Sequence, residues 1–334
     1  MRTAITFVVL AFGGATLWSA QGGQRSSDSN AFVRKGHELF TRVWTVNEGL
    51  GPLVNARTCS GCHTAPTTGG SGTDERSFVS VMPVLNGTGG NVFRRLRVST
   101  MGAIDEELPP MSAALRRAPS LLGSGLLETI SADEIAAGAA ELGTRGRLPQ
   151  GRYGWKGQLR NLEEATAAAF SNELGLSSSM FPDTVGAAAE LSQAQITSVA
   201  SFIRYLPPIR SASVPTDQTG KQLFNQLGCA ACHRPTFRSL EQRNAFPYTD
   251  LLLHDMGPAL ADGIEQGSAS GQEFRTPPLW GIVKTGPPYL HDGRAKTLHD
   301  AITAHGGEAE KSATAYQKLR DLERAAVLAF LRSL

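Results

Sequence analysis

Apolar residues recur at intervals of three and four positions in several short stretches of the chain, which predicts amphipathic helices. Two of these stretches, residues 31–44 and 216–227, share the string Gly-x-x-Leu-Phe, which begins at Gly36 and at Gly220. Two others share a longer helical pattern at a constant offset of 128 positions, from residue 199 to residue 327. Such self-similarity indicates two copies of one helical unit. The matched residues are Val199, Phe202, Ile203, Arg204 and Leu206 in the first copy and Val327, Phe330, Leu331, Arg332 and Leu334 in the second.

The repeat places a domain boundary near the middle of the chain. Residues 207–215 include three prolines and therefore cannot continue a helix. With 334 residues and 41% hydrophobic content, the chain is long enough to form two separate cores. We expect an all-α protein with an N-terminal domain at residues 31–206, a linker at 207–215 and a C-terminal domain at 216–334.

The first 22 residues have the pattern of an export signal. Arg2 precedes an apolar stretch at residues 4–17, and small residues follow near position 22, where cleavage is expected. The bulky Trp18 leaves an uncleaved anchor as the alternative, although the apolar stretch is short for a membrane span. We interpret residues 1–22 as a signal peptide and residues 23–30 as a polar spacer, and we expect a soluble periplasmic protein.

Each half of the chain contains one Cys-x-x-Cys-His motif, which is the attachment signature of a c-type haem. The two thiols bond to the vinyl groups of the haem while the histidine ligates its iron. A redox Cys-x-x-Cys pair or half of a zinc site would leave the histidine after each pair unexplained. We therefore predict two covalent c-type haems, each at the centre of a cytochrome c-like domain. Their attachment residues are Cys59, Cys62 and His63 in the first domain and Cys229, Cys232 and His233 in the second.

The composition narrows the range of partners. The haem motifs use all four cysteines, so we expect no disulfide. The formal net charge is +2, which is too small to suggest a nucleic acid or an anionic membrane surface as a partner.

A second repeat compares the distal sides of the two haems. Residues from Tyr153 onward match residues from Tyr289 onward at an offset of 136 positions, and this register pairs Ala169 with His305. The iron of an electron carrier takes a sixth ligand from the protein, whereas an iron that binds peroxide keeps this position open. We assign His305 as the distal ligand of the second haem. Met256 is the alternative ligand, and a surface histidine near a helix C-terminus is the alternative interpretation of His305.

For the first haem, methionine is the remaining candidate ligand, because no histidine lies between His63 and His233. Methionine in apolar surroundings more often fills a core, so we prefer an open or water-bound first haem. The methionines that could ligate the first haem are Met82, Met101, Met111 and Met180.

For the second haem, the turn at residues 257–260 is expected to orient His233 through a backbone carbonyl.

Four longer stretches carry a family resemblance. They are GPLVNAR at residues 51–57, GRYGWK at residues 151–156, PYTDLLLHDMGP at residues 247–258 and YLHDGR at residues 289–294. In these stretches the chain resembles the di-haem cytochrome c peroxidase superfamily, which includes the methylamine-utilisation di-haem maturases. The similarity is closest to its di-haem oxidoreductase branch, also called thiol oxidoreductases, and it spans nearly all of the chain after the leader.

The resemblance implies a peroxidatic N-terminal haem and an electron-transfer C-terminal haem whose distal ligand occupies the position of His305. Trp155 resembles the aromatic residue between the two haems, and Glu173 resembles the distal acid that moves a proton during peroxide cleavage. Glu128, a second carboxylate in an apolar segment of the same half, ranks after Glu173. Arg117 stands where peroxidases of the superfamily have a calcium-binding Asn, which argues against calcium between the domains.

We therefore expect a peroxidase-like oxidoreductase in which electrons enter at the second haem, pass Trp155 and reach the first haem, where hydrogen peroxide reacts. A small electron-donor protein, a cytochrome c or a cupredoxin, is the expected partner. The pairing of Ala169 with His305 favours this enzyme over a di-haem electron carrier in which both irons are six-coordinate. A maturase or oxygenase that oxidises a protein or an organic substrate is the other alternative.

Overall fold

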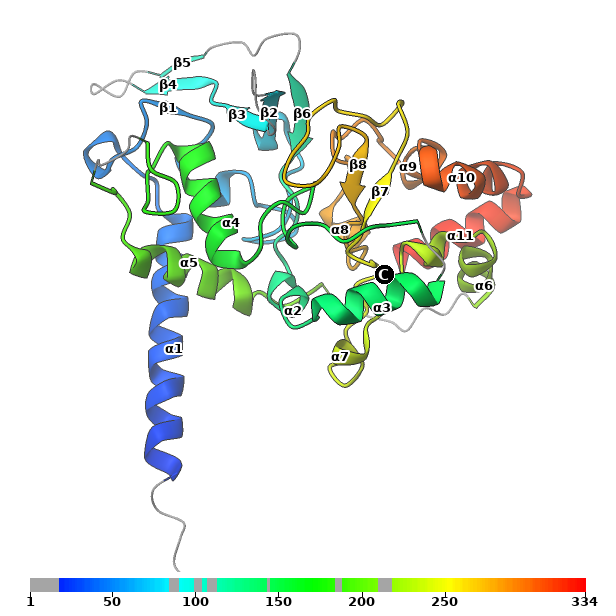
Figure 1. Ribbon diagram of the computed structural model, residues 1–334, viewed down its shortest axis with the longest axis horizontal. Helices are drawn as coiled ribbons and strands as arrows, with labels where there is room; N and C mark the ends of the chain where they lie inside the picture. Colours follow the sequence, from blue (N-terminus) through cyan, green and yellow to red (C-terminus); the bar gives the residue numbers. More distant parts are fainter. Residues whose placement is uncertain are drawn as a thin grey trace, which may run out of the picture.

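The computed structural model describes residues 18–83, 90–98, 104–106, 113–142, 145–183, 188–209 and 218–334 (Figure 1). Most of the predicted signal peptide, the predicted linker from residue 210 onward, Met101 and Met111 lie outside the described residues.

Helices provide most of the regular structure, as the apolar periodicity predicted. The first helix, α1, begins at Trp18 and ends at Thr41, so the predicted spacer at residues 23–30 is helical. This stretch has no proline to interrupt the helix, and Figure 1 shows α1 projecting away from the rest of the protein. The α-helices of the described residues are α1 (Trp18–Thr41), α2 (Ser124–Leu127), α3 (Ala132–Leu142), α4 (Leu162–Ala169), α5 (Gln193–Tyr205), α6 (Gln218–Gln226), α7 (Arg238–Glu241), α8 (Ile282–Thr285), α9 (Leu298–Thr303), α10 (Glu310–Gln317) and α11 (Asp321–Arg332).

In the part of the chain that the structure describes, three small antiparallel sheets correct the all-α prediction. Their strand orders are β1-β4-β5, β3-β2-β6 and β7-β8. The strands have between 2 and 6 residues, so their alternating patterns are too short to stand out in the sequence. The strands are β1 (Leu53–Val54), β2 (Phe78–Pro83), β3 (Gly90–Phe93), β4 (Leu96–Val98), β5 (Ile104–Glu106), β6 (Ala114–Arg117), β7 (Leu253–Asp255) and β8 (Glu273–Arg275).

Each half is built on one pair of crossing helices, α1 with α5 and α6 with α11. The helices cross so closely that a Cβ added at Gly36 would lie 1.9 Å from the carbonyl oxygen of Ser198. A Cβ added at Gly220 would lie 2.1 Å from the carbonyl oxygen of Ala326. Only glycine fits at these two crossings, which explains why both copies of the Gly-x-x-Leu-Phe string begin with it.

Aromatic pairs beside the two crossings repeat the same geometry. Phe40 packs against Phe202 in the first half, and the ring centroids are 5.2 Å apart. Phe224 packs against Phe330 in the second half at the same centroid distance of 5.2 Å. The second residue of each pair belongs to the repeat at the offset of 128 positions, so the predicted internal repeat is present in the fold.

Three clusters of buried apolar side chains form the core of the described residues. One lies in the N-terminal half around Phe40 and Trp44, and one lies in the C-terminal half around Tyr316 and Phe330. The third joins the two halves, so the two predicted domains share an apolar interface. It contains Leu127, Ile130 and Ile135 from the first half and Phe237, Leu240, Ala245, Leu251, Leu252 and Trp280 from the second.

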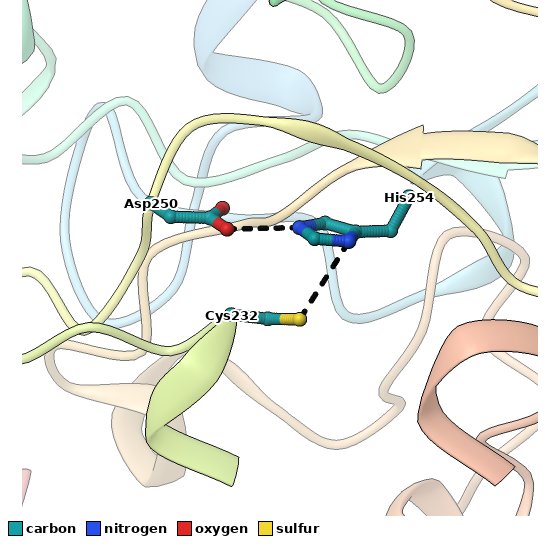
Figure 2. Close-up of side chains that lie close together, drawn as sticks. All are labelled: Cys232, Asp250 and His254. Atoms are coloured by element: carbon teal, nitrogen blue, oxygen red, sulfur yellow. Dashed lines mark hydrogen bonds and ion pairs between the residues drawn. The ribbon is translucent and has the colours of Figure 1, made fainter. Parts of the chain in front are cut away.

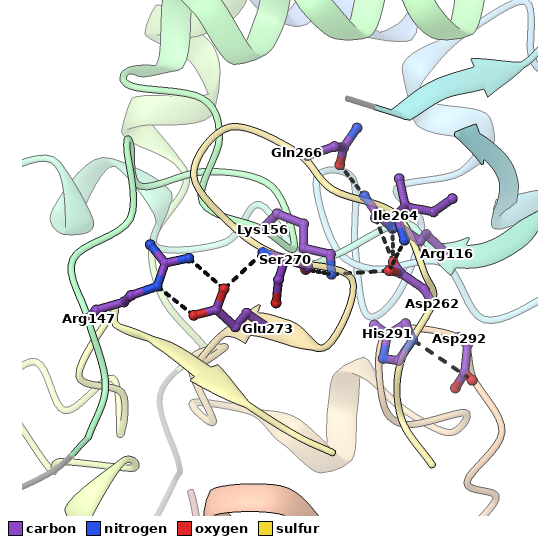
Figure 3. Close-up of polar contacts among 10 residues, drawn as sticks. All are labelled: Arg116, Arg147, Lys156, Asp262, Ile264, Gln266, Ser270, Glu273, His291 and Asp292. Carbon is purple, nitrogen blue, oxygen red and sulfur yellow. Dashed lines mark hydrogen bonds and ion pairs between the residues drawn. The ribbon is translucent and has the colours of Figure 1, made fainter. Parts of the chain in front are cut away.

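Buried cations also join the halves, as Figure 3 shows. The carboxylate of Asp262 accepts from Arg116, whose Nη2 lies 2.6 Å from Oδ2. The other oxygen of the same carboxylate lies 3.1 Å from Nζ of Lys156. Lys156 is fully buried and its Nζ also lies 3.8 Å from the centroid of the Phe274 ring. One acid from the second half therefore binds two cations from the first.

Arg117 makes a further connection. Its guanidinium donates to the carbonyl oxygen of Gly72 at 2.7 Å and to Oγ of Ser71 at 2.7 Å. It also donates to the carbonyl oxygens of Pro288 and Thr285. A side-chain cation thus fills a position between the halves that is lined by oxygens from both.

No helix among the described residues is both long enough and apolar enough to cross a membrane.

We expect Gly220→Ala to lower the free energy of unfolding by about 1–3 kcal/mol, because the added methyl group overpacks the crossing of α6 and α11. The exposed neighbour Lys221 provides the control, since Lys221→Ala should leave the stability within about 0.5 kcal/mol of the wild type. Urea unfolding followed by circular dichroism measures both. Equal stabilities for the two variants would contradict the close crossing.

Candidate functional site

A cavity with a volume of about 1000 Å³ is lined by residues of both halves. Both Cys-x-x-Cys-His motifs contribute to its wall, together with mostly apolar side chains. The predicted site residues that line it are Cys59, Cys62, His63, Trp155, Ala169, Glu173, Cys229, Cys232, His233, Met256 and His305.

The two motifs have the same local structure. Each pair of cysteines spans one 3-10 turn, η2 (Cys59–Gly61) or η5 (Cys229–Ala231). Within each turn the histidine amide donates to the carbonyl of the first cysteine, at 3.1 Å for His63 and 2.9 Å for His233. The turn brings both thiols and the imidazole to one wall of the cavity, as covalent attachment of a haem requires.

A backbone carbonyl orients each of these histidines. Nδ1 of His63 lies 3.0 Å from the carbonyl oxygen of Gly70, and Nδ1 of His233 lies 3.0 Å from that of Tyr248. The prediction that the turn at residues 257–260 orients His233 is therefore wrong. Because Nδ1 donates its hydrogen to the backbone, the lone pair of Nε2 remains for an iron atom. Burial lowers the pKa of His233 to about 4, which keeps that imidazole neutral.

Cys59, Cys62 and Cys229 do not have the properties of reactive thiols. Burial raises the pKa of Cys59 to about 12 and the pKa values of Cys62 and Cys229 to about 11. Redox pairs and zinc ligands use thiolates, whose pKa values are lowered by their surroundings. Thioether formation with a vinyl group removes the thiol altogether, so burial of these sulfur atoms is compatible with haem attachment.

Figure 2 shows Cys232, Asp250 and His254, a cluster of metal-ligand types found among the described residues. Both nitrogens of His254 are already occupied, since Nε2 lies 2.8 Å from Asp250 and Nδ1 lies 2.8 Å from Glu308. Burial lowers the pKa of His254, but the hydrogen bonds to Asp250 and Cys232 outweigh it and raise the pKa to about 11. A protonated imidazole cannot ligate a metal ion, so this cluster is an ion-pair network beside the second motif.

The donor set and the apolar cavity together fit two haems. The attachment residues of both motifs line one cavity, each proximal histidine has its Nδ1 on a carbonyl, and the thiols of Cys59, Cys62 and Cys229 are protonated. The residues of both motifs therefore fit a haem.

The distal side of the second site contains His305. The helix that leads to it, α9, is capped at its N-terminus by Thr297, whose side chain accepts from the amide of Asp300 at 3.0 Å. Nδ1 of His305 lies 2.6 Å from the carbonyl oxygen of Ala301. The ring centroids of His305 and His233 are 6.5 Å apart.

This separation leaves room for an iron atom that both imidazoles would hold. An imidazole nitrogen ligates a first-row metal ion at about 2.0 Å and lies roughly 1 Å from its ring centre, so two imidazoles that hold one iron atom would have centroids up to about 6 Å apart. Burial lowers the pKa of His305, which favours the neutral ligand form. Met256 also lines the cavity, so it remains the alternative ligand.

The distal side of the first site has a methyl group at the equivalent position. Its helix, α4, is capped at its N-terminus by Asn161, whose side-chain oxygen accepts from the amide of Glu164 at 2.9 Å. Asn161 stands 136 positions before Thr297. Ala169 is the last residue of α4 and lines the cavity. Of the four candidate methionines, Met82 and Met180 are described, and neither lines the cavity. No described histidine or methionine faces His63 as His305 faces His233.

Glu173 lies in a π-helical turn, η4 (Phe170–Leu174), that continues from α4. Single π-turns are frequent at functional sites. Nδ2 of Asn55 donates to Oε2 of Glu173 at 3.0 Å, and the Asn55 amide donates to the Glu173 carbonyl oxygen at 2.6 Å. Burial raises the pKa of Glu173 to about 7, although the hydrogen bond from Asn55 and the charge of Arg94 oppose the rise. Glu173 can therefore exchange a proton at neutral pH.

Glu128 lies elsewhere. Its carboxylate binds Arg204, whose Nε is 2.6 Å from Oε2, and it accepts from the amide of Leu162 at 3.0 Å. The side chain does not line the cavity. Glu128 therefore joins α4 to α5, and the structure does not bring it to Glu173 or to either motif.

Trp155 lies at the contact between the two halves. Its indole Nε1 donates to the carbonyl oxygen of Arg117 at 2.8 Å, and its own carbonyl accepts from the amide of Arg275 at 2.8 Å. The ring also makes an edge contact with His291 at a centroid distance of 6.3 Å. The tryptophan is thus fixed by both halves within the cavity that both motifs line.

Sequence reasoning missed two groups of residues at this site. Asn55 stands in the GPLVNAR stretch, but nothing in its spacing indicated that it holds Glu173, which is 118 positions away. The network of Asp250, His254 and Glu308 was missed as well. The Asp-x-x-x-His spacing of the first two was a visible signal, whereas Glu308 is brought there only by the fold.

The comparisons with known proteins agree with this arrangement. Residues 203–334 match the family model described as "Di-haem oxidoreductase, putative peroxidase". No protein of curated function matches the chain significantly.

Solved structures resemble the chain over most of its length. A Kuenenia stuttgartiensis hydrazine synthase structure has a TM-score of 0.50 and 16% sequence identity, and the match covers 100% of this chain and 98% of the other. A MauG-like protein associated with microbial copper homeostasis has a TM-score of 0.47 and 19% identity, with 91% and 88% of the two chains covered. At such identities the first match concerns the fold alone. The family-model match at residues 203–334 includes the second Cys-x-x-Cys-His motif and His305, and it agrees with the family resemblance of the sequence motifs.

Proposed function

We propose that the protein is a di-haem c-type oxidoreductase that reduces hydrogen peroxide at its first haem with electrons received through its second. The observation that carries this proposal is the difference between the two distal sides. His305 faces His233 in one, whereas Ala169 and the buried acid Glu173 line the other.

Haem, when bound at each motif, supplies an iron atom that exchanges single electrons and, where a coordination position is open, binds peroxide. Cys59, Cys62 and His63 would hold the first haem. Cys229, Cys232 and His233 would hold the second, with His305 on its distal side.

Glu173 would provide acid-base help at the first site. Cleavage of peroxide needs a group that takes the proton from one oxygen and returns it to the other. A carboxyl group with a pKa of about 7 does this in either direction at neutral pH. Asn55 fixes the carboxylate by its hydrogen bond to Oε2, so the proton is exchanged from a defined position.

Trp155 would carry electrons between the two sites. An indole shortens each tunnelling distance when it lies between a donor and an acceptor, and this one is held by hydrogen bonds to both halves. The chain would act in the periplasm, with a small cytochrome c or cupredoxin as the electron donor.

The first prediction concerns haem content. Protein purified from a host that matures c-type cytochromes should hold two covalent haems per chain, because both motifs are complete. The double variant Cys59→Ala/Cys62→Ala should hold one. A pyridine haemochrome assay measures both, and a wild type whose haem is extracted by acid acetone would contradict covalent attachment.

A second prediction concerns the distal ligand of the second haem. His305→Ala should convert the low-spin signal of that haem to high-spin and leave the haem content unchanged, because Ala offers no ligand. Met256→Ala is the matched control and should keep the low-spin signal. Electron paramagnetic resonance decides between the two ligands, and loss of the signal only in Met256→Ala would reverse the assignment.

A third prediction concerns Glu173. Glu173→Gln should slow the spectral response of the first haem to peroxide by roughly a hundredfold, the effect expected when general acid-base help is lost. The wild-type rate should rise with pH through about 7, because the carboxylate form accepts the proton, and the variant should lack this rise. Stopped-flow spectra across pH 5 to 9 measure both effects.

Two controls separate this role from others. Trp155→Phe should leave the first reaction with peroxide at its wild-type rate but slow the following electron transfer from the second haem.

Because burial raises the pKa of Glu173 from 4.5 to about 7, ionisation lowers the stability of the wild type as pH rises between these values. Glu173→Gln should therefore gain stability relative to the wild type at pH 8 but not at pH 4. A wild type that is low-spin at both haems and inert to peroxide would instead favour an electron carrier.

A further inference from the structure

Arg275, the last residue of β8, is a buried arginine whose donors reach only backbone oxygens. Its Nε donates to the carbonyl oxygen of Gly154 at 3.2 Å, and its Nη1 donates to that of Thr276 at 3.0 Å. Only 7% of the residue is exposed. Among the described residues, Nη2 has no acceptor and no carboxylate forms an ion pair with this guanidinium.

Arg275 is positively charged at neutral pH, and no carboxylate of the described residues forms an ion pair with it. Burial lowers its pKa to about 10, which still leaves it protonated. The charge of Asp250 favours the protonated form of Arg275, but the hydrogen bonds of that carboxylate go to Nε2 of His254 and the amide of Leu252. An unpaired buried charge is strongly unfavourable, so a partner for this one is required.

The other cations at the contact between the halves do have partners. Arg116 and Lys156 share the carboxylate of Asp262. Arg117 matches Arg275 in the sequence repeat Arg-x-Pro-x-Leu-x-Gly, but its guanidinium donates to four protein oxygens. The second copy of the repeat therefore keeps an arginine at the equivalent place and leaves one edge of its guanidinium unpartnered.

This arginine lines the cavity that both Cys-x-x-Cys-His motifs line. Its amide is bonded to the carbonyl of Trp155, which fixes its backbone beside that residue. Its partner strand, β7, follows Tyr248, whose carbonyl orients His233. A ligand in the cavity that carries an anionic group can therefore reach the open edge of Arg275.

We propose that Arg275 binds a propionate carboxylate of a haem held in this cavity. The assignment rests on the haem-binding part of the proposed function. A c-type haem carries two propionates after its vinyl groups have reacted, and a guanidinium fork matches a carboxylate with two parallel hydrogen bonds. The propionate can belong to either haem. The hydrogen bonds to Arg275 would be the same in both cases, but substitution of Arg275 would change the reduction potential of a different haem.

The pairing has a measurable effect on that haem. A cation beside a propionate disfavours the ferric state, which has one more positive charge than the ferrous state, so Arg275 raises the reduction potential. Arg275→Gln should shift the reduction equilibrium of one haem at least tenfold toward the ferric state, which is about 59 mV for a one-electron couple. Arg275→Lys keeps the charge and should retain most of the wild-type potential.

The experiment uses the holoprotein with both haems attached, verified by pyridine haemochrome. Spectroelectrochemical titration gives the potential of each haem, and resonance Raman spectroscopy gives the propionate bending band. We expect that band to shift for one haem in Arg275→Gln and in Arg275→Lys, because neither side chain reproduces the two parallel hydrogen bonds. The haem whose band and potential both move is the one that Arg275 binds.

The matched control is Arg152→Gln. Arg152 also donates to a backbone carbonyl, that of Leu127 at 3.3 Å, but it does not line the cavity. This variant should keep both potentials and both bands. Unchanged bands and potentials in Arg275→Gln, or in Arg275→Lys if the first does not mature, would overturn the assignment. A wild type with two haems that is inert to peroxide would refute the peroxidase function and leave this test intact.

Discussion

The contact between the two halves is the constraint on which the site depends, because the cavity is lined by residues from both. Apolar packing around Trp280 provides part of that contact. Buried cations provide the rest: Asp262 binds Arg116 and Lys156, and Arg117 donates to oxygens of both halves. Buried ion pairs add little net stability, but they fix geometry because an unpaired partner is so costly. These contacts thereby hold the two halves in one relative position.

Within this frame, the two halves use the same scaffold for different chemistry. Both have a glycine crossing, a Cys-x-x-Cys-His turn and a capped helix on the other side of the cavity. They differ where these helices end: α4 continues through a π-turn that carries Glu173, whereas α9 stops before Gly306 and Gly307 and presents His305. Because the supporting structure is shared, a few substitutions are enough to make one site a candidate for catalysis and the other a candidate for electron transfer.

Positively charged residues hydrogen-bond to Trp155 or adjoin it in the sequence. Arg117 accepts the indole hydrogen bond through its carbonyl and Arg275 donates its amide to the Trp155 carbonyl, while Lys156 is the next residue along the chain. The side chains of all three are buried cations. A carbonyl is too weak a base to take the indole proton, and cations oppose a positive charge on the ring. A haem propionate beside Arg275 would offset part of the positive charge of these cations. The position of the haem would therefore affect how strongly they oppose a positive charge on the Trp155 ring.

The sequence by itself determined the units of this protein. The haem motifs, the Gly-x-x-Leu-Phe strings and the two offsets are local patterns with a direct physical meaning, so they predicted the repeated helices and the pairing of Ala169 with His305. The sheets were missed because strands of 2 to 6 residues have no clear period.

Only the tertiary structure decided which distant residues meet. Asn55 reaches Glu173 across 118 positions, and burial there raises the pKa of that acid to about 7. Glu128, the second-ranked candidate acid in the sequence, is bound by Arg204 outside the cavity. Arg117 and Arg275 share one motif, yet one is surrounded by protein oxygens and the other has an open edge. Burial, pKa and hydrogen-bond partners depend on long-range packing, which no local pattern encodes.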